Sequence, residues 1–304
     1  MAGYIWAVLV VWLVIAPSPA IAQGLPFLLE AGATLESAAG ETYAAAPFIT
    51  ALAAADVVYL GETHTSVADH LAELAILQAL YAENPQIAIA LEMFQRPFQP
   101  VIDRYLSGEI DEATLRQQSE YDTRWNYPWA YYAPILRFAQ AHQIPVIALT
   151  APAEVTQRVS MKGPEAIQTG DRRYVPAAAD WVLGPPDYRQ FMLTIYKEIH
   201  QGLGAGQGFD RFFAVQILWD ETMAAAIAEF RQVHNRPVLV LAGQGHVIYN
   251  FGIPDRVQRR SDEAIQQQSV LLNPIATFEV ETDRAIANYL WHAPMIEAGC
   301  ENVS

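Results

Sequence analysis

Glutamate and histidine gather in the segment LGETHTSVADH, residues 60–70, although the whole chain has only 7 histidines. The segment places Glu62, His64 and His70 where an apolar run ends and a helical pattern begins. If the chain stays extended between Glu62 and His64, the two side chains point the same way. Neighbouring imidazole and carboxylate groups can hold a transition-metal ion or act as a general acid/base pair.

Two more apolar runs are followed by a glutamate or a histidine. The run IAIAL is followed at once by Glu92, and the run PVLVL leads to Gly243-Gln244-Gly245-His246, which repeats the G-x-x-H spacing of residues 61–64. The carboxyl ends of parallel strands share one edge of a sheet, and α/β proteins bind their ligands at that edge. We therefore predict that three strand ends deliver these side chains to one rim.

Four short runs rich in Val, Ile and Leu predict buried strands of a parallel sheet: Asp56–Leu60, Ile87–Leu91, Pro145–Leu149 and Pro237–Leu241. Helical patterns separate them, at residues 67–83, 98–107, 111–119, 129–142 and 210–233. This alternation predicts an α/β fold with a mainly parallel sheet flanked by helices. Residues 271–281 predict a late strand at an edge. Residues 153–208 have no strand pattern and end in GLGAGQG, which predicts a helical insertion.

A helix is expected to start at Val67, since Ser66 and Asp69 have the spacing of a capping box. His70 would then lie in the first helical turn, near the top of the buried face. A structural histidine held by hydrogen bonds is an equally good interpretation of His70.

Residues 1–22 form an apolar run that ends in Ala20-Ile21-Ala22, which predicts a signal peptide cleaved before Gln23 and an exported domain over residues 23–304. A retained anchor is the alternative, because no Lys or Arg precedes the apolar run. The net charge of −15 argues against nucleic acid and anionic membrane surfaces as partners. We expect a periplasmic or other extracytoplasmic protein without membrane association after cleavage.

Five segments in order resemble the ChaN-type haem-uptake proteins of the Tiki superfamily: LGETHTSVADH, ALEMFQRPFQ, YYAPILRFAQAHQIPVIALTAP, ILWDETMAAAIAEF and VLAGQGHVIYNFGIPDRV. The resemblance runs from about residue 50 to 260. It implies an α/β body, export, haem binding and a role in iron acquisition. It also implies a site at His64, Glu92 and His246, with Glu62 beside the first. Members are often lipoproteins, whereas this leader has no cysteine for lipidation.

The resemblance suggests a haem-binding protein whose iron is held by a tyrosine or a histidine. Tyr249 is the best placed tyrosine, and Tyr59 and Tyr127 are alternatives. Arg256 is expected near the propionates, and Trp125, Tyr127 and Trp129 could supply a flat apolar slot. The predicted haem-binding residues are His64, His70, Glu92, His246, Tyr249 and Arg256.

The alternative function is a metal-dependent hydrolase, similar to peptidases or esterases. His64, Glu92 and His246 would hold one divalent ion, and the catalytic set would be Glu62, His64 and His246, with Glu62 activating the metal-bound water. Asp220 is expected to orient a histidine from a long apolar helix. For the haem-binding function, a homodimer that sandwiches haem between its two subunits is a further arrangement to consider.

Overall fold

The computed structural model describes residues 24–199, 206–261, 264–275 and 280–293. The proposed leader lies outside the described residues, as do Cys300 and part of the predicted late strand. No helix within the described ranges is both long and apolar enough to cross a membrane.

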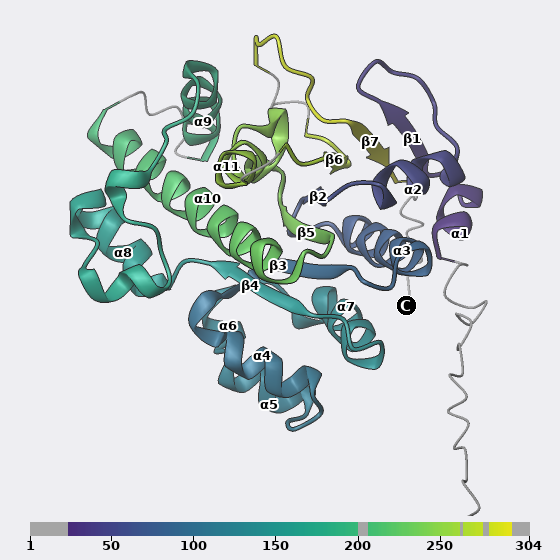
Figure 1. Ribbon diagram of the computed structural model, residues 1–304. Helices are drawn as coiled ribbons and strands as arrows, with labels where there is room; N and C mark the ends of the chain where they lie inside the picture. Colours follow the sequence, from purple (N-terminus) through teal and green to yellow (C-terminus); the bar gives the residue numbers. More distant parts are fainter. Residues whose placement is uncertain (1–23, 200–205, 262–263, 276–279, 294–304) are drawn as a thin grey trace, which may run out of the picture.

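The described part of the chain forms one seven-stranded sheet in the order β1-β7-β6-β2-β5-β3-β4 (Figure 1). All neighbouring strands are parallel except β1 and β7, which pair antiparallel at one edge. The prediction of an α/β fold with a mainly parallel sheet is therefore confirmed. The strands are β1 Thr34–Ser37, β2 Val57–Glu62, β3 Ala88–Gln95, β4 Val146–Thr150, β5 Val238–Gly243, β6 Gln267–Leu272 and β7 Tyr289–His292.

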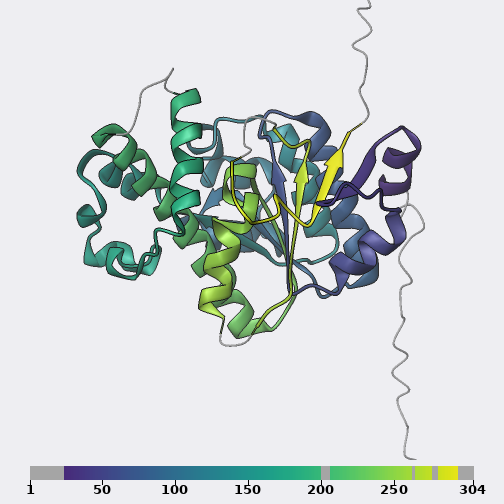
Figure 2. The same cartoon turned by 90° about the horizontal axis from the view of Figure 1, so that it is seen from above.

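Helices cover both faces of the sheet, so alternate strand residues enter two separate cores (Figures 1 and 2). Leu60, Leu91 and Leu241 point into the first core, where α3 and α7 pack, whereas Tyr59 and Val240 point into the second, where α9, α10 and α11 pack. Because both faces are buried, β2 and β5 consist almost entirely of apolar residues rather than alternating polar and apolar ones.

The helices on the first face and at the strand ends are α1 Gly24–Glu30, α2 Ala45–Ala53, α3 Val67–Glu83, α4 Gln99–Leu106, α5 Glu112–Gln118, α6 Tyr121–Arg124 and α7 Trp129–Ala141. The others are α8 Ala153–Lys162, α9 Pro186–Ile199, α10 Gln207–His234 and α11 Ile253–Arg260. Helix α3 begins as its sequence predicts: the Ser66 hydroxyl accepts a hydrogen bond from the backbone N–H of Asp69.

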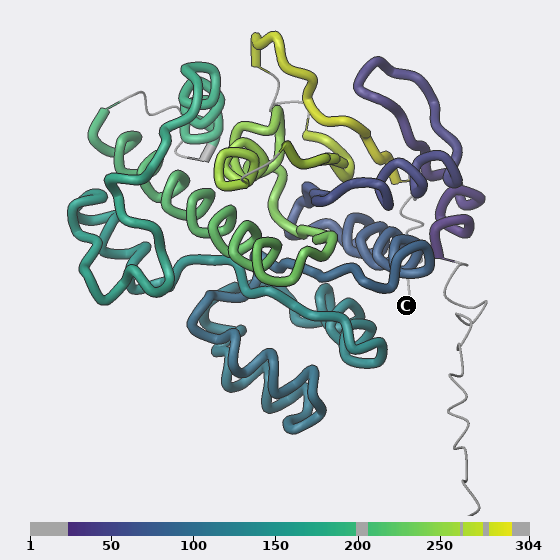
Figure 3. Tube along the Cα trace, viewed as in Figure 1, coloured from purple at the N-terminus to yellow at the C-terminus, as the bar shows by residue number. Residues whose placement is uncertain are grey.

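The segment predicted as a helical insertion contains α8, three short 3₁₀ helices and α9, and its described residues include no strand. In Figure 3 this teal segment runs beside α10, which α8 and α9 both contact. Helix α10 also packs against β4 and α11, and its buried side chains form part of the second core.

The central strands decide where the site lies. β5 is inserted between β2 and β3, although β2 and β3 follow each other in the chain. Glu62 therefore stands directly opposite Gly243 in the parallel ladder, and Leu91, the residue before Glu92, stands opposite Leu241. The three strands whose ends were singled out from the sequence, β2, β5 and β3, are therefore adjacent in the sheet.

Candidate functional site

The first half of the site is built on the end of β2. Glu62 is its last residue and is 2% exposed; its Oε1 lies 2.5 Å from His64 Nδ1 and accepts a hydrogen bond of 2.7 Å from the Tyr132 hydroxyl. Burial opposes ionisation of this carboxyl, but the hydrogen bond with His64 and the neighbouring His70 ring keep the pKa of Glu62 below its ordinary value. Glu62 is therefore a charged anchor for the His64 ring.

His64 turns its second nitrogen towards the end of β5. A Cβ placed on Gly243 would lie 3.0 Å from His64 Nε2, so the absence of a side chain there makes room for the ring. Trp125 and Tyr127 border the other side, with ring centroids 4.8 and 4.9 Å from that of His64. Burial lowers the pKa of His64, but Glu62 and Glu92 outweigh it and raise that pKa above its ordinary value.

The second half of the site is His246, which is held by a residue from α10, on the other face of the sheet. His246 follows β5; its Nδ1 lies 2.6 Å from Oδ1 of Asp220, which projects from α10, and its Nε2 lies 3.4 Å from Oε1 of Glu92. Tyr188 donates a hydrogen bond to the other oxygen of Asp220. Although burial favours the neutral ring, Glu92 and Asp220 raise the pKa of His246 to about 10. The expected contact between Asp220 and a histidine is therefore present.

Glu92 joins the two halves. It lies inside β3 rather than after it, because Met93 and Phe94 are also buried and extend the strand to Gln95. Its Oε2 accepts a hydrogen bond of 2.7 Å from the backbone N–H of Gly243. Burial raises the pKa of Glu92, but the charges of His246 and His64 prevail and lower it. A buried carboxylate thus faces two imidazoles.

A cleft of about 450 Å³ opens over these groups, in the range of small-molecule sites. Its polar surface comes from Glu62, His64, Gln216, Gln244 and His246. Its apolar and aromatic walls come from Tyr127, Met192, Ile195, Phe212, Trp219 and Ile275. The cleft combines apolar walls with two imidazoles and one phenol.

The predicted metal ligands His64, Glu92 and His246 lie close together, and the two histidines line the cleft while Glu92 does not, but these three are not the tightest group. Among the described residues, the group whose ligand atoms all lie within 4.8 Å of one another consists of Glu62, His70 and Glu73. Sequence reasoning missed Glu73. Its signal was a carboxylate three residues after His70, on the face of α3 that points into the core.

Of the six predicted haem-binding residues, four do not line the cleft: His70, Glu92, Tyr249 and Arg256. Tyr249 is 4% exposed and packs on Phe251, and its hydroxyl accepts a hydrogen bond from the backbone N–H of Val280. Arg256 is 2% exposed and donates to the backbone oxygens of Phe251 and Val182. Neither is among the described residues that line the cleft.

Two of the other aromatic residues named from the sequence are also structural. The hydroxyl of the buried Tyr59 donates to Oε1 of Gln267, and the indole of Trp129 donates to Oε1 of Glu112. Tyr127 is the one of the three candidate tyrosines that lines the cleft. His70 is buried, with its ring stacked on Tyr131 at a centroid distance of 4.6 Å.

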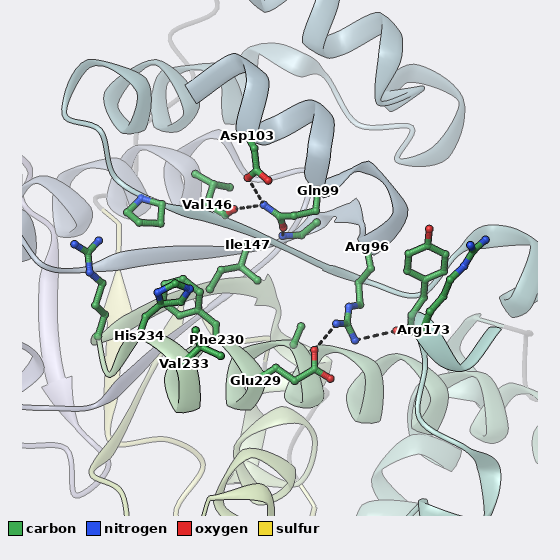
Figure 4. Close-up of a pocket in the computed structure, with 15 residues that line it drawn as sticks. Arg96, Gln99, Asp103, Val146, Ile147, Arg173, Glu229, Phe230, Val233 and His234 are labelled. Atoms are coloured by element: carbon green, nitrogen blue, oxygen red, sulfur yellow. Dashed lines mark hydrogen bonds and ion pairs between the residues drawn. The ribbon is translucent and has the colours of Figure 1, made fainter. Parts of the chain in front are cut away.

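A larger cleft, of about 720 Å³, lies along the edge strand β4 (Figure 4). The Gln99 side-chain amide donates to the backbone oxygen of Val146 and accepts from the N–H of Ala148. It therefore makes the hydrogen bonds to β4 that the backbone of a neighbouring strand would otherwise make. Arg96 forms an ion pair with Glu229 across this cleft. Neither His64 nor His246 lines this larger cleft, so the volume of a cleft alone does not identify the functional site.

Residues 48–257 match the family described as haem-binding uptake, Tiki superfamily, ChaN. The chain therefore belongs to this family, as its five sequence segments indicate. A search of curated proteins gives no significant match.

Comparison with solved structures shows which folds this chain resembles. The structure described as cofacial haem binding to ChaN of Campylobacter jejuni has 19% sequence identity and a TM-score of 0.68, with 85% of this chain and 96% of that chain covered. A mutant erythromycin esterase is 10% identical with a TM-score of 0.43, covering 75% of this chain and 71% of that chain. The first of these similarities shows a shared fold.

Proposed function

We propose that this protein binds haem in the strand-end cleft. The observation that carries the proposal is the lining of the cleft, in which aromatic and aliphatic walls enclose the side chains of His64, His246 and Tyr127. A porphyrin needs apolar walls for its faces and a nitrogen or oxygen donor for its iron. Membership in the ChaN family supports the same ligand.

The donor set fits haem. Haem proteins use histidine nitrogen or tyrosine oxygen as iron ligands, and both are present here. Glu62 holds Nδ1 of His64, which leaves Nε2 to serve as a ligand. Tyr127 is the alternative ligand, and its half-buried side chain forms part of the wall of the cleft. When bound, haem would supply the iron centre, and these residues would hold and orient it.

Both donors must lose a proton before they can hold iron. Burial raises the pKa of Tyr127, and the charges of Glu92 and Glu62 raise it further. The pKa of His64 is raised as well. Since the protonated forms compete with iron, we expect the affinity for haem to increase as the pH rises above neutrality.

Paired tyrosine variants test which phenol serves the site. We expect Tyr127→Phe to weaken haemin binding at least about 10-fold and to change the visible spectrum. Tyr249→Phe removes the same hydroxyl from a tyrosine in the core and should leave the spectrum unchanged. The assignment to Tyr127 is wrong if the core variant loses haem and the cleft variant keeps it.

We also propose an exported protein of haem or iron acquisition. Support comes from the apolar leader and its Ala20-Ile21-Ala22 motif, together with family membership. Cell fractionation with N-terminal sequencing tests this, and a mature chain that begins at Gln23 in the periplasmic fraction is the expected result. An uncleaved protein in the cytoplasmic fraction would contradict it.

A metal-dependent hydrolase remains the second candidate, favoured by one observation. Glu92 lies against both histidines: its Oε1 is 3.4 Å from His246 Nε2, and its Oε2 and the Nε2 of His64 both border Gly243. Hydrolysis of ester or peptide substrates that disappears in Glu92→Gln together with one bound ion would support this candidate. Full haem binding without such an ion would exclude it.

A further inference from the structure

A second cluster of buried polar groups lies behind the cleft, between the end of β2 and the first turns of α3. It consists of Glu62, His70 and Glu73, which are 2%, 5% and 0% exposed. His70 Nδ1 lies 2.9 Å from Oε2 of Glu73 and 3.2 Å from Oε2 of Glu62. Two carboxyl groups and an imidazole therefore converge at one point in the core.

Hydrogen bonding fixes how the His70 ring is oriented. Its Nε2 lies 3.2 Å from the backbone oxygen of His64. A carbonyl oxygen can only accept, so Nε2 must carry the hydrogen, and in a neutral imidazole Nδ1 is then an acceptor. Metal-binding histidines commonly donate their second ring N–H to a backbone carbonyl in this way.

The two carboxyl groups bring their oxygens to the same place. Burial and the charge of Glu62 raise the pKa of Glu73 well above its ordinary value, so without a cation the Glu73 carboxyl keeps a proton that it can donate. Oε2 of Glu62 and Oε1 of Glu73 are both buried and have no hydrogen-bond partner. Unpartnered buried carboxylate oxygens are costly. The point where Oε2 of Glu62 and Oε2 of Glu73 approach His70 Nδ1 therefore calls for either a proton or a cation. The remaining oxygen of Glu62 is occupied by His64 and Tyr132, so it does not compete for that charge.

We propose that Glu62, His70 and Glu73 form a binding site for a divalent metal ion of the zinc type. Two carboxylates balance the charge of such an ion, and mixed imidazole and carboxylate ligands suit zinc. Bonds of about 2.0–2.1 Å at tetrahedral angles separate ligand atoms by roughly 3.3 Å, close to the 2.9 and 3.2 Å found here. The site is separate from His64, Glu92 and His246 and does not depend on haem binding.

This site would act on the cleft through Glu62. One oxygen of Glu62 would hold the ion while the other holds the His64 ring in place. The ion would thus be a structural centre that fixes the direction of His64 Nε2. A proton shared among the same three side chains is the alternative occupant, and it would leave the protein without a stoichiometric ion.

The test is a zinc chloride titration of the purified full-length protein after chelation, with elemental analysis of the dialysed sample. We expect about one equivalent of zinc in the unaltered protein and at least about 10-fold weaker binding in Glu73→Gln. Glu92→Gln, which removes the buried carboxylate beside His64 and His246 instead, is the matched comparison and should retain the zinc.

Two results would overturn the proposal. One is unaltered protein that holds no zinc after dialysis, which is the outcome expected for a shared proton. The other is zinc lost from Glu92→Gln and kept by Glu73→Gln, which would move the ion to the cleft. Anomalous diffraction at the zinc edge on crystals of the unaltered protein gives an independent reading if a variant fails to fold: a peak beside His70 is expected, and a peak elsewhere refutes the site.

Discussion

Replacing Asp220 by Asn tests the electrostatic account of the second half of the site. Asp220 is buried and lies 2.6 Å from His246 Nδ1. The rise in the pKa of His246 from 6.5 to about 10 corresponds to roughly 5 kcal/mol, at about 1.4 kcal/mol per pH unit. Since Glu92 and Asp220 share this rise, we assign roughly 2 kcal/mol of folding stability at neutral pH to the charge of Asp220.

The pH dependence has a definite sign. The pKa of His246 is higher in the folded protein than in the unfolded chain, so its contribution is complete below about pH 6.5 and is lost as the pH rises through about 10. We therefore expect the difference in unfolding free energy between the unaltered protein and Asp220→Asn to be about 2 kcal/mol at pH 7 and to shrink towards pH 10.

Urea unfolding at a series of pH values measures this difference. Glu229→Gln is the control, because Glu229 is a solvent-exposed carboxylate paired with Arg96 and should change stability by less than about 1 kcal/mol. A destabilisation of Asp220→Asn that stays constant from pH 7 to 10 would refute the ionic interpretation, and no destabilisation at all would refute the role of the contact.

Three further changes are predicted. Ser66→Ala removes the cap of α3 and should lower the unfolding free energy by about 1 kcal/mol in urea, with an unchanged value counting against the cap. Gly243→Ala places a Cβ 3.0 Å from the His64 ring and should weaken haemin binding several-fold in a spectroscopic titration while the protein stays folded; undiminished binding would show that the close approach is unimportant. Gly61→Ala places a Cβ 2.8 Å from Leu271 Cδ2 and should cost about 1–3 kcal/mol by overpacking, measured as a lower Tm; an unchanged Tm would mean that Leu271 can move aside.

Much of the fold could be predicted because buried parallel strands have a strong sequence signal. The four apolar runs became β2, β3, β4 and β5, and the helix predicted over residues 67–83 has those bounds. The edge strand β1 and its neighbour β7 were not foreseen, since each has only four residues and β1 carries polar residues such as Glu36 and Ser37. Short, partly exposed strands lack the continuous apolar pattern of central ones.

The candidate site was predictable at the strand ends and less so away from them. Glu62, His64 and His246 were recognisable because they follow apolar runs at G-x-x-H turns. The partners Glu73 and Tyr132 come from helices that pack on the first face, and only the tertiary fold shows which of their side chains reach Glu62.

The role of Tyr249 could not be judged from sequence spacing either. Its backbone adopts a φ of 55°, in the left-handed region, at a bend just after His246. The bend carries the ring into the second core, against Phe251, instead of into the cleft. Closeness in sequence to a site residue therefore did not mean closeness to the site.

Haemin titration of the purified protein, followed by visible absorbance, tests the central claim most directly. The account predicts a saturable Soret shift at a defined stoichiometry, lost or altered when His64 or Tyr127 is replaced and kept in Arg173→Ala, which changes the larger cleft along β4. A titration without saturation, or a shift that disappears in Arg173→Ala and survives both strand-end variants, would contradict haem binding at the strand ends.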